Sequence, residues 1–391
     1  MTPFFSRFRD AVSRRVKPPP KPTAYKHSPW ERLPDNVLVS LLTFCKLKDI
    51  ASLALTCHSV YSRLVKNESA IARSWLNFRI NICAPPYNDH DFENDIGLSP
   101  SDDLTFIASL FPPPPPLYAI GDGHEDADYS IAYLADLESC WTTCIRLCYH
   151  LADHTVRHHL DTDPVIWQLW NSSKTETEYV YTKAVETLQK KLLPSMAYCI
   201  FFLESAASDG LDLNCSGQAI YLSTSIRRQQ AILQKPPFTD TQVLISTQHC
   251  MQLMCSTVRQ LMSPNIPHSS SENWVALLLS TCTLKKIVEF FAAIAKDEEM
   301  NASRSHHRSW SHRKQYLLEM RETLGQYIPS AKQTRHTASK SKSVLPTLDQ
   351  VWFGAAYREL RQREAIPHPA EYPIHILHGS EMILGCKYCD R

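Results

Sequence analysis

The chain has 391 residues, of which 43% are hydrophobic and 21% are charged. This length accommodates two or three domains, and the composition excludes a wholly disordered chain because it supplies enough apolar surface for a core. The formal net charge of +1 excludes a molecule-wide field that would attract nucleic acid or an anionic membrane.

Glycine and proline usage predicts an all-α fold. The 9 glycines are too few for the tight turns of a sheet protein, while the 26 prolines gather in clusters typical of connectors. The 13 cysteines are scattered along the chain, most of them in segments of helical periodicity, and no secretory signal opens the chain, so we expect reduced thiols in the cytoplasm or nucleus. No stretch reaches the ~18 uninterrupted apolar residues that a membrane span requires.

Residues 1–30 are basic and rich in proline, and we expect a disordered tail there. Phe4, Phe5 and Phe8 alternate with arginines, so an amphipathic helix at a membrane surface or a mitochondrial presequence is the alternative interpretation.

Residues 31–80 are predicted to form a small three-helix block. Helix one has apolar residues at i, i+1, i+4 and i+5 after Pro34, and Asp49 is a candidate cap for helix two. A block of about 45 residues is close to the lower limit of independent stability. We therefore expect part of its apolar surface to be covered by a partner.

The same residues resemble the F-box family, especially F-boxes of filamentous fungi. Asn36, Cys45 and Val60 depart from the family pattern, whereas the matching positions span the whole block. These matches are Leu33-Pro34, Val37-Leu38, Leu41-Leu42, Asp49-Ile50, Leu53, Cys57, Tyr61, Leu64 and Trp75.

The resemblance implies that the block docks onto the Skp-type linker protein of a cullin-RING ligase. Leu38→Asp is then expected to abolish linker binding, because an apolar interface does not accommodate a carboxylate. The positions that the resemblance assigns to linker contact, or to direct support of it, are Leu33, Pro34, Leu38, Leu42, Ile50, Leu53 and Leu64.

Residues 81–128 are predicted to be a proline-rich linker, because five consecutive prolines after Phe111 favour an extended, semi-rigid spacer. Residues 129–391 are predicted to form a larger, helical-bundle-like domain with a flexible loop near 329–347. Pro194 is expected to kink or divide one of its helices. The segments with helical periodicity are 129–160, 177–207, 215–234, 239–263, 272–298, 309–328 and 348–365.

Two clusters suggest metal chemistry. His375, His378, Cys386 and Cys389 form a His-x-x-His and Cys-x-x-Cys pair that would suit a tetrahedral zinc ion; an unligated tail is the alternative. His154 shares a helix face with His158, and with Asp161 it could serve a metal-dependent hydrolase.

Simpler interpretations exist for these helical clusters. Histidines in a last helical turn complement the helix dipole. Cys140, Cys144 and Cys148, at i, i+4 and i+8, are explained as small side chains buried on a packed helix. No motif supplies a catalytic set, so we expect no enzyme and no cofactor other than the hypothetical zinc.

The sequence therefore predicts a substrate-receptor subunit of an SCF-type ubiquitin ligase, without a nucleic-acid partner or a membrane span. Its F-box would bind the linker, and its helical domain would bind a target protein that the sequence does not identify. The alternatives are an F-box scaffold that acts outside ubiquitylation and the helical hydrolase.

Overall fold

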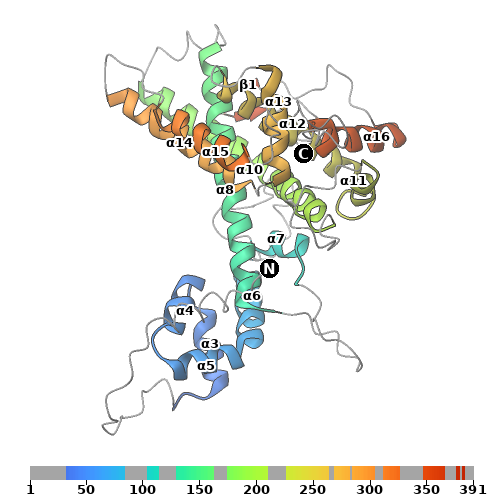
Figure 1. Ribbon diagram of the computed structural model, residues 1–391. Helices are drawn as coiled ribbons and strands as arrows, with labels where there is room; N and C mark the ends of the chain where they lie inside the picture. The colour runs from blue at the N-terminus through green and yellow to red at the C-terminus, as the bar shows by residue number, and fades with distance from the viewer. Residues whose placement is uncertain are drawn as a thin grey trace, which may run out of the picture. The chain divides into compact units, whose positions relative to one another are not determined.

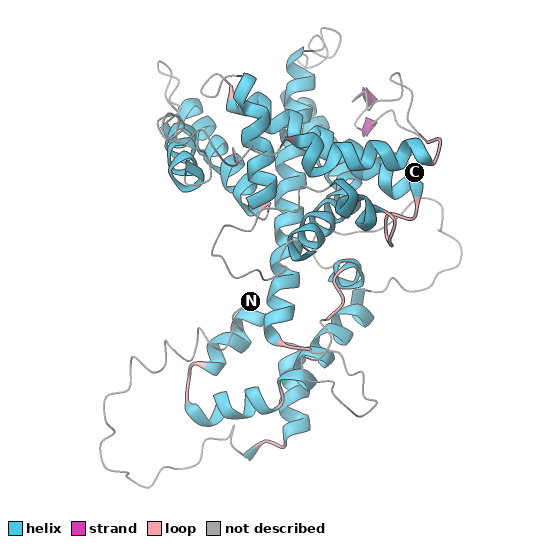
Figure 2. Cartoon of the chain, turned by 45° about the vertical axis from the view of Figure 1, so that its right-hand side comes forward, coloured by secondary structure: helices cyan, strands magenta, loops and turns pink. Residues whose placement is uncertain are grey.

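The structure is a computed structural model of the chain. It describes residues 32–83, 104–113, 129–162, 174–209, 226–263, 268–281, 284–303, 311–325, 347–365, 376–378 and 381–383. These residues are almost entirely helical, which confirms the all-α fold (Figure 2). The exception is a short antiparallel hairpin of β1 (Ile376–His378) and β2 (Glu381–Ile383), in which Leu377 pairs with Met382.

The chain divides into two compact units, Met1–Thr142 and Thr143–Arg391. The first unit is built on four helices: α3 (Asp35–Thr43), α4 (Leu47–Ala54), α5 (His58–Lys66) and α6 (Glu68–Cys83) (Figure 1). The periodicity of the first three helices is as expected, and α6 adds a fourth that packs against α3.

Apolar side chains from all four helices form the core of this unit, and the largest of them are fully buried: Leu42, Ile50, Leu64 and Ile71. The Trp75 indole N–H donates to the Cys45 carbonyl (2.9 Å), which ties α6 to the loop after α3. Asp49 is not the cap of α4, because that helix begins two residues earlier at Leu47 and places Asp49 in its first turn.

A fifth helix, α7 (Leu104–Leu110), lies inside the range predicted as a linker. Leu104, Ile107 and Leu110 recur at helical spacing and are buried, and α7 packs against α6. The first turns of α8 (Ile131–Thr162) complete the unit. The Glu68 carboxylate accepts from the Ile131 N–H (2.9 Å), so a side chain of α6 caps the start of α8.

The second unit contains the remainder of α8 and a helical assembly in which α10 and α12 lie side by side (Figure 1). Pro194 lies inside α10 without dividing it. The expected helix 272–298 is two helices, α13 and α14. The elements are α10 (Lys174–Asp209), α11 (Ile226–Leu233), α12 (Thr241–Met262), α13 (His268–Thr281), α14 (Lys285–Ser303), α15 (Ser311–Gly325), a π-helical turn η2 (Asp349–Phe353) and α16 (Gly354–Gln362).

The core of the second unit combines aromatic rings with thiols. Trp352 meets Phe202 edge to face, with ring centroids 4.5 Å apart, and both side chains are fully buried. Cys144 and Cys148 are buried, as the sequence predicts for them, whereas Cys140 is half-buried. Across the described ranges, no helix is both long and apolar enough to cross a membrane.

Candidate partner-binding site

Helix α3 presents two apolar faces. Leu38 and Leu42 are 2% and 1% exposed and face the core, whereas Val37 is 39% exposed, Leu41 44% and Phe44 67%. Pro34 immediately precedes the helix and is also exposed. Residues 34, 37, 41 and 44 follow the three- and four-residue spacing of one helix face, so they form a continuous outer stripe of Pro34, Val37, Leu41 and Phe44.

A ring contact orients Phe44, the last residue of the outer stripe. The ring of Phe44 meets the ring of Phe78 edge to face at 4.6 Å, which orients Phe44 while leaving most of it exposed. Leu55, directly after α4, is a further exposed apolar side chain, at 53%. Contiguous exposed apolar side chains are typical of protein–protein contact sites. The outer stripe is therefore a candidate docking surface.

The structure separates the residues that the sequence assigned to linker binding into two groups. The positions on the surface or partly on it are Leu33, Pro34 and Leu53. The positions in the core of the first unit are Leu38, Leu42, Ile50 and Leu64. The second group can support a docking surface from below but is not accessible to a partner.

Sequence reasoning did not assign Val37, Leu41, Phe44 or Leu55 to partner contact. The available signal was the width of the apolar pattern: residues 37, 38, 41, 42 and 44 cover more of a short helix than one core contact requires. An apolar arc of that width indicates a helix that packs against two different surfaces.

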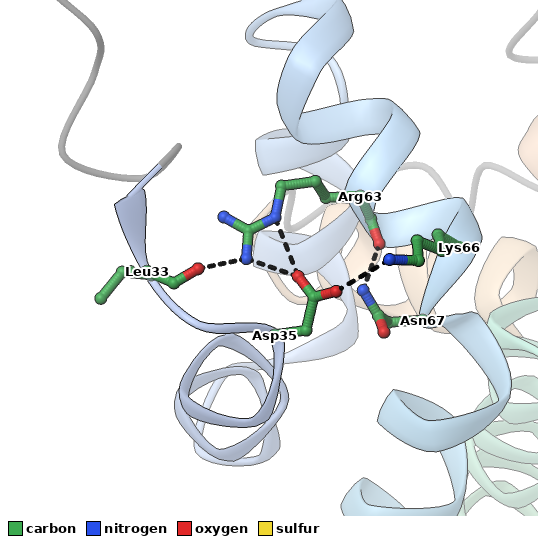
Figure 3. A network of polar contacts seen from close by, with 5 residues as sticks. All are labelled: Leu33, Asp35, Arg63, Lys66 and Asn67. Atoms are coloured by element: carbon green, nitrogen blue, oxygen red, sulfur yellow. Dashed lines mark hydrogen bonds and ion pairs between the residues drawn. The ribbon is translucent and has the colours of Figure 1, made fainter.

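A cluster of polar side chains fixes the segment just before α3 (Figure 3). The Asp35 carboxylate accepts from Arg63 through Nε (3.1 Å) and Nη2 (2.6 Å) and from the Lys66 ammonium (3.2 Å). Arg63 Nη2 also donates to the backbone carbonyl of Leu33. The Asn67 amide donates to the Arg63 carbonyl (3.0 Å) at the end of α5. We call Asp35, Arg63, Lys66 and Asn67 the Asp35 cluster.

Hydrogen bonds from Arg63 first, and then from Lys66, hold the pKa of the Asp35 carboxyl below its ordinary value. Asp35 is also the first residue of α3, where a negative charge complements the positive end of the helix dipole. The carboxylate therefore remains charged at neutral pH and keeps both cations in place.

The proposed zinc ligands lie mostly outside the described residues. His375, Cys386 and Cys389 are outside, and His378 ends β1 with only its backbone described. Within the residues that are described, no group of three or more histidine, cysteine or acidic side chains is arranged to hold a metal ion.

The histidine cluster of α8 is associated with a network of ion pairs. Arg157 pairs with Asp153 (3.0 Å) and with Glu298 of α14, and the Tyr181 hydroxyl of α10 donates to Asp153. His154 is half-buried, and burial lowers its pKa. The side chain of Asp161 is outside the described residues. Asp153 and Arg157 thus connect three helices.

No protein-family model matches the chain, and no curated protein and no solved structure matches it. Fold and site alone define its class: an all-α protein whose helix α3 carries an exposed apolar stripe beside a network of charged groups.

Proposed function

We propose that this chain is the substrate-receptor subunit of an SCF-type E3 ubiquitin ligase, acting in the cytoplasm or nucleus. Its first unit would bind the Skp-type linker protein through the outer stripe. The F-box-like register of residues 33–75 supports this proposal, as does the packing of that register into a small helical unit with an uncovered apolar face.

The outer stripe is the observation that carries the proposal. Val37, Leu41 and Phe44 expose 39%, 44% and 67% of their surface, and covering that remaining fraction is worth roughly 0.6–2 kcal/mol for each side chain. A helix laid against an apolar groove by residues at three- and four-residue spacing is a recurrent mode of protein recognition.

The second unit would hold the target protein, while catalysis would belong to other subunits of the ligase. A receptor needs no catalytic residue, because tethering a target beside the ubiquitin-charged enzyme raises its effective concentration. This division of roles agrees with the absence of catalytic motifs from the sequence.

Leu41→Asp tests the docking surface. Leu41 is 44% exposed, so the folded chain tolerates the carboxylate, whereas an apolar interface does not. We expect at least a tenfold loss of affinity for a recombinant fungal Skp-type linker protein, measured by calorimetry with the full chain. Leu38→Asp is a poorer test because Leu38 is 2% exposed, so that change would damage the fold itself.

Asn36→Asp is the matched control, because it adds the same charge to another exposed position of α3. It should bind the linker as the wild type does. Equal affinity of Leu41→Asp and wild type would contradict the proposed docking surface.

Recovery of a cullin with the linker in a pull-down is the expected result for a ligase subunit, and recovery of the linker alone would favour a scaffold outside ubiquitylation.

A further inference from the structure

The Asp35 cluster lies where α3 begins (Figure 3). Pro34 is the N-cap of α3 and forms no side-chain hydrogen bond there. The proline ring fixes φ at Pro34 but leaves the direction of the chain before it to other contacts. Arg63 of α5 makes such a contact by donating to the Leu33 carbonyl, on the residue before Pro34.

We propose that Arg63 is a positioning residue for partner docking: it fixes Leu33 and Asp35 on both sides of Pro34, and so orients the outer stripe. This inference rests on the proposed function. One guanidinium bonds both the backbone before Pro34 and the carboxylate after it. The Asp35 cluster therefore locks the start of the stripe onto the end of α5, across 28 residues of sequence.

The geometry requires arginine in particular. Nη2 donates to the Leu33 carbonyl and to Asp35 Oδ1, while Nε donates to the same carboxylate oxygen. A planar guanidinium presents these donors in a fixed arrangement, whereas a lysine ammonium is a single point on a flexible stem. Lys66 occupies the other oxygen, Oδ2, at 3.2 Å, so the carboxylate is held from two consecutive turns of α5.

Partial exposure of the cluster separates its positioning role from a stabilising role. The Arg63 side chain is 18% exposed and that of Asp35 is 39% exposed. The Asp35 carboxylate is open to water, which screens this ion pair and limits its contribution to the free energy of folding. Their loss should therefore loosen the segment around Pro34 while the buried core of Leu38, Leu42, Ile50 and Leu64 keeps the helices together.

Arg63→Gln in the full chain tests the proposal. We expect a tenfold or greater loss of affinity for the recombinant Skp-type linker protein, with the helical circular dichroism signal retained. Deuterium uptake should rise in the peptide covering residues 33–38. Arg63→Lys should not restore affinity, because lysine retains the positive charge but lacks the planar arrangement of N–H donors. The charge swap of Asp35→Arg with Arg63→Asp should also fail, because an aspartate at 63 offers no donor to the Leu33 carbonyl.

Controls separate the possible failures. Lys183→Gln removes a cation from a surface pair in the second unit and should leave linker affinity unchanged. Asp35→Asn, which keeps the side-chain shape, gives the second measurement if Arg63→Gln loses its helical signal. Wild-type affinity in Arg63→Gln or full rescue by Arg63→Lys would overturn the positioning role alone. Absence of linker binding by the wild type would overturn the proposed function.

Discussion

A single buried histidine makes the stability of the second unit depend on pH. His249 of α12 is 4% exposed, and burial lowers its pKa to about 4 from an ordinary value near 6.5. Above pH 6.5 the imidazole is neutral in the folded and the unfolded chain, so its ionisation does not change the free energy of unfolding. Between pH 6.5 and 4 the unfolded chain takes up the proton and the folded chain does not.

The free energy of unfolding should therefore fall as the pH falls through that window, by on the order of 3 kcal/mol in total from this residue. We expect His249→Gln to flatten the dependence of the urea midpoint on pH between 4.5 and 6.5, followed by circular dichroism. Parallel slopes for His249→Gln and wild type would contradict this account.

Asp297 of α14 fixes the start of the next helix, α15. Its buried carboxylate accepts from the backbone N–H groups of His312 (3.0 Å) and Arg313 (2.8 Å), and so caps α15 from α14. Burial by itself would raise the pKa of Asp297, but these hydrogen bonds and the one from His312 outweigh burial and lower it. The carboxylate is therefore charged in the folded chain at neutral pH.

At the scale of one element, α3 combines a buried apolar face with an exposed one. We expect Leu38→Ala to lower the free energy of opening of α3 by about 2–5 kcal/mol, because it leaves a cavity in the core. Leu41→Ala removes the same atoms from an exposed position and should change it by less than about 0.5 kcal/mol. Amide hydrogen exchange of residues 35–43 measures both values.

The effects on linker affinity should follow the opposite order. For a given loss of stability, Leu41→Ala should lower linker affinity more than Leu38→Ala, because Leu41 belongs to the outer stripe and Leu38 does not. Similar destabilisation by the two changes would show that Leu41 is covered within the chain. In that case the outer stripe would have no surface to offer a partner, and α3 would be an ordinary core helix.

At the scale of the whole molecule, the described cysteines differ widely in burial, from exposed to fully buried. Cys57 is exposed, whereas Cys144, Cys148 and Cys199 are buried among α8, α10 and α12. Burial raises the pKa of the Cys148 and Cys199 thiols well above the ordinary value. Because the thiolate is the reactive form, both factors protect these side chains.

We expect iodoacetamide at pH 8 to label Cys57 on the order of 100-fold faster than Cys148 or Cys199 in the native chain, and all at similar rates in urea. Peptide mass spectrometry assigns each rate to its residue. Rapid native labelling of Cys148 would mean that the core around α8 and α12 opens readily.

The helical character of the chain was predictable because apolar spacing is a local property. The positions of α3, α5, α12 and α16 follow from it. Local spacing did not predict that residues 272–298 form two helices, nor that α7 lies within a proline-rich region. Contacts such as Asp35 with Arg63 were not predictable, since a pair of charges 28 residues apart has no local signal.

The sequence by itself determined an all-α chain with a small N-terminal helical block. Only the tertiary structure decided which apolar residues of α3 are buried and which are exposed. Val37 and Leu38 are equally apolar neighbours, yet α6 packs over one side of α3 and leaves the other uncovered. Burial depends on what a face meets in three dimensions, and periodicity defines only which residues share that face.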